Sequence, residues 1–293
     1  MGPAVIIGGV VLFVIVLGML GWFAATREAA VRRAWRRFLA WPTIDWLGRR
    51  YPAGVAFLEA RLSPTGYLGI NLTLGGLVVI GAGWLFGGIA EDVVTGDPLT
   101  KVDHRIAAWF HAQAVPPLTK AMMLLTELGG LRGIAIASGT LAIYLAWRRQ
   151  WHWLGALLLA VPGGMVVNVL TKYAFARARP SFADPLLTLT TYSFPSGHVT
   201  ASTLFYGFLA AYLVARIPAW RWRVPFVLIA SFAVAVVGLT RVYLGVHFLS
   251  DVLAAFALGT AWLAMVLTTL HTFRVRQSRC DAGKARSHRG RPH

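Results

Sequence analysis

The chain has 293 residues, of which 57% are hydrophobic and 13% charged, and its mean hydropathy is +0.63. This balance excludes an ordinary soluble domain and indicates a membrane protein. The formal net charge of +17 would suggest nucleic acid as a partner of a soluble protein. In a membrane protein the distribution of Lys and Arg along the chain indicates orientation instead. We therefore expect no nucleic-acid partner.

Seven apolar segments are long enough to cross a membrane. A hydrocarbon core about 30 Å thick takes roughly 20 residues of helix, and each span must be helical because unsatisfied backbone groups are costly in lipid. The sequence therefore predicts an all-α fold, a polytopic membrane helical bundle with a six-helix core and one extra N-terminal transmembrane helix. The predicted spans are residues 4–25, 67–90, 121–147, 152–173, 198–216, 224–240 and 249–271.

The first span is interpreted as a retained anchor with its N-terminus outside. A secretory signal carries its positive charge before the apolar core, whereas here the charge follows, on Arg27, Arg32, Arg33, Arg36 and Arg37. Residues 26–66 are too polar to span the bilayer. Their pattern suits a basic helix at the lipid surface, and an ordinary basic linker is the alternative.

The basic residues predict the orientation of the chain, because Lys and Arg gather on the cytoplasmic side. Connections on one side hold 20 of the 28 Lys and Arg; they are residues 26–66, 148–151, 216–223 and the tail from 272. The C-terminus is therefore expected in the cytoplasm. The mixed-charge loop 91–120 and the stretch SFPSGH at residues 193–198 fall on the outer side.

These observations divide the chain into three parts. Residues 1–66 form a transmembrane anchor with a basic interfacial segment, and residues 67–271 form the membrane domain. Residues 272–293 form a basic cytoplasmic tail whose composition predicts disorder. The single Cys280 excludes an internal disulfide framework.

Three polar clusters interrupt the apolar spans, all on the outer side. Charged groups near membrane depth are expensive and indicate function. The clusters are Lys172 with Arg179 and Pro180 in TKYAFARARP, then Pro195 to His198 in SFPSGHVTAS, then Arg241, His247 and Asp251 in TRVYLGVHFLSD.

Each cluster alone has a plainer interpretation. Lys172 and Arg179 could be residues that snorkel at a helix end, and His198 could follow Ser196 as part of a polar helix N-terminus. The pair of His247 and Asp251 is harder to explain by structure alone. Residues at i and i+4 share one helix face, so the carboxylate can hold one imidazole nitrogen and leave the other free.

A metal site and a phosphate site compete for this constellation. A metal would take His198, His247 and Asp251 as ligands, but three cations at the same face would repel it; they are Lys172, Arg179 and Arg241. Those cations instead match phosphate oxygens, and Ser196 and Gly197 add a hydroxyl and a backbone N–H at a helix N-terminus. The sequence predicts a phosphate site that needs no metal and no cofactor.

Two histidines beside a phosphate suggest a division of roles. His247, backed by Asp251, is the better nucleophile toward phosphorus because the carboxylate fixes its tautomer and stabilises the developing positive ring. His198 then donates a proton to the leaving oxygen. The cations stabilise charge on the transferring group.

Together the clusters resemble the signature of the type 2 phosphatidic acid phosphatases, the PAP2 superfamily, in its bacterial membrane lipid phosphatase branch. The one departure is Thr240, where Ser is usual. The resemblance covers about residues 67–271. It implies a six-helix core, a phosphohistidine at His247 and no metal, with oxyanion contacts from Lys172, Arg179, Ser196, Gly197 and Arg241.

The expected activity is metal-independent hydrolysis of a lipid phosphate or diphosphate at the extracytoplasmic face of a bacterial plasma membrane. The candidate substrates are phosphatidylglycerophosphate, phosphatidate and undecaprenyl diphosphate, and the expected partners are this lipid and the bilayer. A phosphotransferase that passes the phosphoryl group to a lipid or sugar hydroxyl is the main alternative. A haloperoxidase and a transporter or scaffold with an inactive site fit less well. The sequence does not indicate an oligomeric state.

Overall fold

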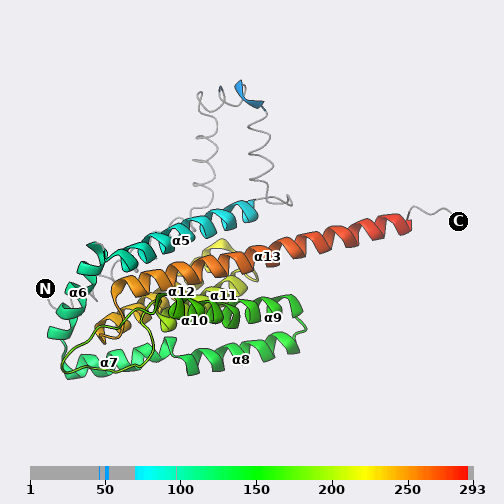
Figure 1. The fold of residues 1–293 in the computed structure, drawn as a ribbon. Helices are drawn as coiled ribbons and strands as arrows, with labels where there is room; N and C mark the ends of the chain where they lie inside the picture. Colours follow the sequence, from blue (N-terminus) through cyan, green and yellow to red (C-terminus); the bar gives the residue numbers. More distant parts are fainter. Residues whose placement is uncertain (1–45, 47–49, 53–69, 97, 290–293) are drawn as a thin grey trace.

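The computed structural model describes residues 46, 50–52, 70–96 and 98–289, and the regular structure within these ranges is helical. Figure 1 shows the helices as a long bundle. In chain order they are α5 (Ile70–Thr95), α6 (Pro98–Ala112), α7 (Pro116–Thr126), the 3₁₀ turn η1 (Glu127–Gly129), α8 (Leu131–Trp147), α9 (Trp151–Leu158), the π-helical turn η2 (Leu159–Gly163), α10 (Gly164–Phe175), α11 (Gly197–Val214), α12 (Trp220–Tyr243) and α13 (Leu249–Arg289).

Six segments of the described chain are long and apolar enough to cross a membrane. They are Leu72–Thr95, Pro116–Trp147, Trp151–Phe175, Gly197–Val214, Arg221–Tyr243 and Leu249–Arg274. The prediction of an all-α membrane bundle with a six-helix core is confirmed. The predicted extra N-terminal span, residues 4–25, lies outside the described residues, as does nearly all of the basic segment 26–66.

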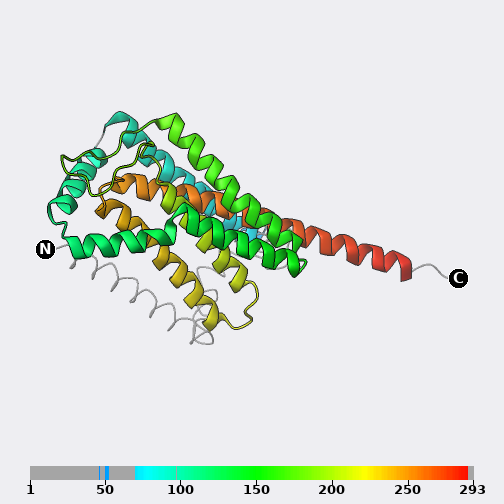
Figure 2. The same ribbon diagram turned by 90° about the horizontal axis from the view of Figure 1, so that it is seen from below.

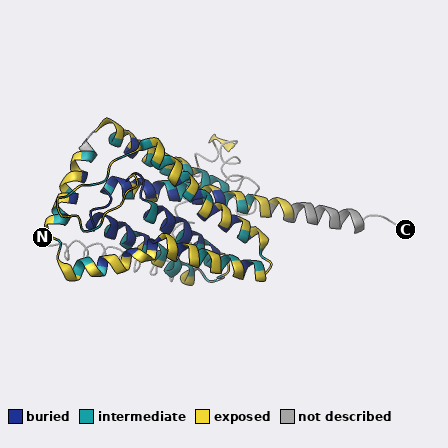
Figure 3. Ribbon diagram, turned by 60° about the horizontal axis from the view of Figure 1, so that its bottom comes forward, coloured by how far each residue is buried: buried dark blue, intermediate teal, exposed yellow. Residues whose placement is uncertain are grey.

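Helix α13 runs through the middle of the bundle and packs along α5 and α11, while α11 also packs along α12. The interior side chains of α11 are buried on nearly all sides, as expected for a helix that is apolar around its whole circumference. Figure 3 shows the buried residues gathered in these inner helices and exposed ones on the outer helices. The exposed apolar residues, such as Ile80 and Trp84 of α5, are suited to lipid.

Small residues let the inner helices approach closely. An added Cβ at Gly164 of α10 would lie 2.5 Å from Leu204 Cδ1 of α11. One at Gly207 of α11 would lie 2.5 Å from Leu263 Cδ2 of α13. Both distances are far shorter than carbon atoms tolerate, so a larger residue at either position would require the leucine side chain to move.

The irregular loop 176–196 joins α10 to α11. It begins where Ala176, at φ 44°, takes the left-handed conformation and ends α10. It is anchored by the buried Phe194, whose ring packs against Phe86 of α5 and Phe175 of α10. In both Figure 1 and Figure 2 this loop lies at the same end of the bundle as α6 and α7. The long C-terminal half of α13 projects from the other end.

The tail differs from the prediction of disorder from residue 272, because α13 continues as a helix to Arg289. The segment RVRQSRCDAGKARSHR has five Arg, two Ala, one Gln and one Lys among its 16 residues, and these are good helix formers. Since α13 is already nucleated within the membrane, each further residue extends it without a new nucleation cost.

Candidate functional site

The three sequence clusters meet at the end of the bundle near α6. Lys172 lies in the last turn of α10 and Arg241 in the last turn of α12, while Ser196 precedes the first turn of α11. His247 occupies the turn between α12 and α13, and Asp251 lies in the first turn of α13. Helix ends from four parts of the sequence thus converge on one small region.

The backbone holds these pieces together. Ser196 N–H donates to Asp251 O at 3.1 Å, which ties the start of α11 to α13. The backbone N–H groups of Val246 and His247 both donate to Arg241 O at 3.3 Å, which closes the turn after α12. This turn needs Gly245, because its φ is +68° and an added Cβ would lie 2.9 Å from the Phe182 ring.

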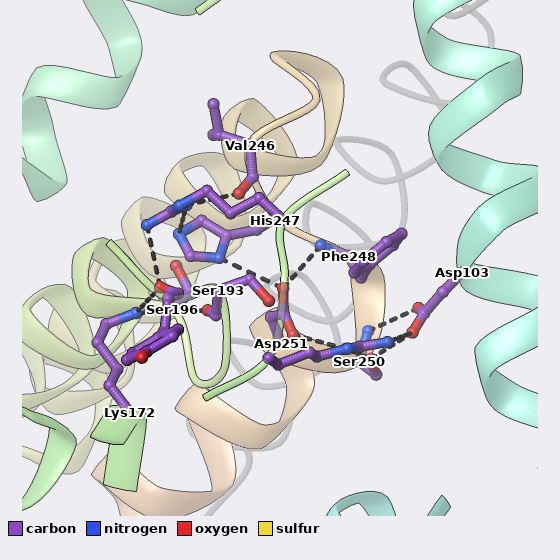
Figure 4. A network of polar contacts seen from close by, with 12 residues as sticks. Asp103, Lys172, Ser193, Ser196, Val246, His247, Phe248, Ser250 and Asp251 are labelled. Carbon is purple, nitrogen blue, oxygen red and sulfur yellow. Dashed lines mark hydrogen bonds and ion pairs between the residues drawn. The ribbon is translucent and has the colours of Figure 1, made fainter. Parts of the chain in front are cut away.

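His247 and Asp251 form the predicted pair. His247 Nδ1 lies 3.4 Å from Asp251 Oδ2, and both side chains are buried (Figure 4). His247 Nε2 lies 3.2 Å from Arg179 Nη1. Because a guanidinium only donates, Nε2 must be the acceptor and the proton must sit on Nδ1, facing the carboxylate. The lone pair of the ring is therefore on Nε2, where it faces the Arg179 guanidinium.

Burial lowers the pKa of His247 from its usual value near 6.5 to about 4. The hydrogen bond and charge of Asp251 oppose this shift, while Arg179 and Arg241 add to it. The ring is consequently neutral at neutral pH, and a neutral imidazole is the nucleophilic form.

Arg179 binds the loop as well as the histidine. Its guanidinium donates to Thr191 O at 2.6 Å, to Val246 O at 2.6 Å and to Tyr192 O at 3.1 Å. Burial lowers the pKa of Arg179 from its usual value, and the charge of Asp251 opposes this. The cation thus lies directly against Nε2 of His247, where an oxygen of a bound phosphate would sit.

Arg241 and Ser196 carry buried polar atoms without a partner among the described residues: Nε and Nη2 of the arginine, and Oγ of the serine. Only Nη1 of Arg241 is used, in a bond to Thr126 Oγ1 at 3.0 Å. Buried unpaired donors are costly and call for an explanation. A phosphate, which accepts through several oxygens, would satisfy all three atoms.

His198 and Lys172 line a cavity of about 590 Å³. Arg179, Arg241 and His247 also lie within electrostatic reach of His198. Lys172 Nζ donates to Tyr192 O at 2.7 Å. The structure therefore brings together the residues predicted from sequence, with Gly197 also in the cavity wall.

Asn168 is a site feature that the sequence analysis missed. It lies one turn before Lys172 on α10, is only 1% exposed and lines the same cavity. Its Nδ2 donates to Thr200 Oγ1 at 2.9 Å, and that hydroxyl in turn donates to Ser196 O at 3.0 Å. Because the threonine proton is already used, the amide orientation is fixed. The Asn168 carbonyl oxygen is left without a partner among the described residues.

A second missed feature is a buried ionic network behind His247. Arg177 donates to Asp251 Oδ1 at 2.6 Å and to Asp103 Oδ2 at 2.9 Å. Ser250 joins it through a short bond from its hydroxyl to Asp103. The signals were an arginine two residues before Arg179 and an acidic residue on α6 in a chain with only 11 Asp and Glu. Neither shows in sequence which partner it meets.

The chain is similar in sequence to proteins of one known family. The PAP2 superfamily matches residues 151–274, which include all three clusters. Phosphatidylglycerophosphatase B of Bacillus subtilis is 38% identical over 150 residues, covering 49% of this chain and 71% of the relative. The chain belongs to the PAP2 superfamily. It is a membrane phosphatase of that family, built on the six-helix core.

The chain is also similar to a second relative and to a solved structure. An undecaprenyl-diphosphatase of Sulfolobus acidocaldarius is 31% identical over 115 residues, 38% of this chain and 51% of the relative. The crystal structure of a transmembrane PAP2-type phosphatidylglycerolphosphate phosphatase from Bacillus subtilis superposes with a TM-score of 0.59 at 29% identity. It covers 64% of this chain and 93% of that one. The family match leaves α5 to α8 unassigned, so the boundaries 1–66, 67–271 and 272–293 stay a prediction.

Where the family usually has Ser, this PAP2 chain has Thr240. Its hydroxyl is buried and donates to Val237 O at 2.6 Å, one turn back on α12. The hydroxyl is therefore engaged with the helix backbone and lies outside the polar cavity. Serine could make the same bond.

Proposed function

We propose that this PAP2 phosphatase removes the phosphate of a lipid phosphate or diphosphate through a phosphohistidine on His247. The proposal assigns attack to His247, support of its ring to Asp251 and proton donation to His198. The phosphate oxygens are bound by Lys172, Arg179, Ser196, Gly197 and Arg241.

The cavity beside His198 is the observation that supports a lipid as the substrate. Its polar part contains Asn168, Lys172 and His198 with residues 190–192 of the loop, and the rest of its wall is largely apolar, formed mainly by α8, α10 and α11. Two of the apolar residues in this wall, Leu131 and Val169, are exposed on the outer surface of the helices. A cavity whose apolar wall includes residues exposed to lipid suits a substrate whose head reaches the cations while its chains stay in the bilayer. By contrast, an apolar groove of about 730 Å³ between α6, α12 and α13 contains none of the predicted site residues.

The reaction is proposed to run in two steps. Nε2 of His247 forms a bond to phosphorus while the bond from phosphorus to the lipid oxygen breaks, and His198 gives its proton to that oxygen. A water then attacks phosphorus, the P–N bond breaks, and His198 takes a proton from the water. The fixed cations stabilise charge on the phosphoryl oxygens in both steps.

The names of the relatives suggest the substrates to test. One relative is named for phosphatidylglycerophosphate and another for undecaprenyl diphosphate, and phosphatidate completes the set predicted from the sequence. The leaving group is an alcohol for the monophosphates and a lipid monophosphate for the diphosphate. Hydrolysis of either kind needs the same constellation, so only rates can rank them.

The experiment is phosphate release by the purified full-length protein from these three lipids, with excess EDTA throughout. We expect turnover of at least one lipid, and no turnover by His247→Ala. Loss of wild-type activity in EDTA would contradict the metal-independent mechanism. Loss of phosphate from the lipid only when a lipid or sugar hydroxyl is added, with the phosphate recovered on that hydroxyl, would show the phosphotransferase alternative instead.

We further propose that the site faces the extracytoplasmic side of a bacterial plasma membrane. The support is the excess of Lys and Arg in the connections at the opposite end of the bundle. Phosphate would then be released outside the cell, and the C-terminus would lie in the cytoplasm.

A further inference from the structure

We propose that Asp103 and Arg177 are positioning residues of this phosphatase: Asp103 on α6 holds Arg177, and Arg177 holds Asp251 in the orientation that supports His247. The inference rests on the proposed role of His247 as nucleophile. It adds a helix, α6, that lies outside the family match at residues 151–274.

Both terminal nitrogens of the Arg177 guanidinium donate hydrogen bonds within the network. Arg177 Nη1 donates to Asp251 Oδ1 at 2.6 Å and to Ser250 Oγ at 2.7 Å, and Nη2 donates to Asp103 Oδ2 at 2.9 Å. Ser250 N–H donates to Asp103 Oδ1 at 2.9 Å. Figure 4 shows Asp103, Ser250 and Asp251 joined in this way. Each oxygen of Asp103 therefore has a donor.

The Asp251 carboxylate is held so that its two oxygens have different tasks. Oδ1 accepts from Arg177, whereas Oδ2 accepts from Phe248 N–H at 2.9 Å and faces His247 Nδ1. The Phe248 ring lies against the guanidinium, with 4.4 Å between Arg177 Cζ and the ring centroid. Rotation of the carboxylate away from His247 would break the bonds to both Arg177 and Phe248.

The second carboxylate matters for charge as well as for geometry. Both Asp103 and Asp251 are fully buried, and the Arg177 side chain is 10% exposed. A guanidinium paired with Asp251 alone would cancel the negative charge that the ring of His247 needs when it becomes cationic. Because Arg177 is shared with Asp103, the group keeps one net negative charge next to Nδ1.

The charges of Arg177 and Asp103 predict opposite shifts of the pH profile of kcat/KM when each residue is replaced by a neutral one. His247 is faced by Asp251 from α13, by Arg241 from α12, by Arg179 from the loop and by His198 from α11. Its pKa is about 4, and the neutral ring reacts, so kcat/KM falls as pH drops through that value. Removing a nearby cation raises the pKa of His247 and moves this acid limb to higher pH. Removing a nearby carboxylate moves it lower.

The test compares Arg177→Gln and Asp103→Asn in the full-length protein, with Lys101→Gln on the exposed face of α6 as the matched control. We expect kcat to fall by about 10- to 100-fold in Arg177→Gln, the range for lost supporting contacts, with KM nearly unchanged. Asp103→Asn should lose less. The acid limb should move to higher pH in the first variant and to lower pH in the second, while Lys101→Gln matches the wild type.

Wild-type kcat in both variants, or acid limbs that move in the same direction, would overturn the proposal. A rise in KM with kcat unchanged would also overturn it, since Arg177 would then bind phosphate directly. Arg177→Lys separates orientation from charge: an acid limb back at the wild-type pH with partial recovery of kcat supports the proposal, and an acid limb that stays where Arg177→Gln puts it contradicts it. Activity in His247→Ala would instead contradict the proposed function on which the inference rests.

Discussion

His198 and His247 are chemically alike in sequence but differ in their surroundings. His247 is 2% exposed and held between Asp251 and Arg179. His198 is partly exposed and lines the cavity, with cations around it and no carboxylate bonded to it among the described contacts. A nucleophile needs a fixed tautomer, whereas a proton donor needs access to the leaving oxygen. The two environments match the two proposed roles.

The acid role of His198 predicts an effect that depends on the leaving group. His198→Ala should lower kcat/KM by about 10²- to 10⁴-fold for a lipid monophosphate, the usual contribution of a general acid. The loss should be smaller for a diphosphate or an aryl phosphate, whose leaving groups need less protonation. The measurement is kcat/KM for each substrate, with His152→Ala on α9 as the control. Equal losses across the substrates would argue against proton donation.

The candidate residues were predictable from sequence because each motif is short and its internal spacing is visible. Each of the three clusters lies at the end of an apolar span on the same predicted side; they contain Lys172, His198 and His247. They were therefore expected at a similar depth in the membrane. The partners of Arg177 were not predictable. Asp103 and Ser250 are 147 positions apart, and their contact follows from how α6 folds over the bundle end, which no local pattern records. The unpaired carbonyl oxygen of Asn168 was not predictable either, because it depends on the bond from the Asn168 amide to Thr200.

At the scale of elements, the end of α10 stores strain. Ala176 adopts φ 44°, a left-handed conformation that costs a non-glycine residue about 1–2 kcal/mol. It turns the chain at once from Lys172 toward Arg177 and Arg179 in the loop. Helices commonly end with glycine at such a position.

Ala176→Gly should therefore stabilise the protein. The relieved strain exceeds the additional chain entropy of glycine in the unfolded state, about 0.4–1 kcal/mol, so we expect a net gain of about 0.5–1 kcal/mol in the free energy of unfolding. Reversible unfolding of the purified protein in detergent micelles measures it. Ala178→Gly, in the same loop without a positive φ, is the control and should be neutral or destabilising. A loss of stability in Ala176→Gly would contradict the strain argument.

The helices of the core were predictable to within a few residues because length and hydropathy decide what can span lipid. How they pack was not. The contact of α13 with α5 joins helices far apart in the sequence, and the close approach at Gly164 and Gly207 depends on which face each helix turns inward. The helical course of α13 to Arg289 was missed because composition alone ignores the helix that precedes it.

At the scale of the whole molecule, the distribution of charge gives the bundle two unlike ends. The end with the site has α6 and the loop 176–196, and the other has the basic turns and the C-terminal part of α13. The proposed orientation predicts that a reporter fused after His293 is cytoplasmic and that one fused after Gln113 is outside. A reporter active only in the cytoplasm and one active only outside check both positions. An external C-terminus would invert the assignment.

The central claim is that phosphorus becomes bonded to His247, and the most direct measurement is to trap that bond. Purified protein is mixed with a ³²P-labelled lipid phosphate, quenched within the first turnover and digested for peptide mapping. We predict an acid-labile, alkali-stable label on the peptide that contains His247, and none in His247→Ala. Rapid turnover without label at any quench time, or label on another residue, would contradict the account.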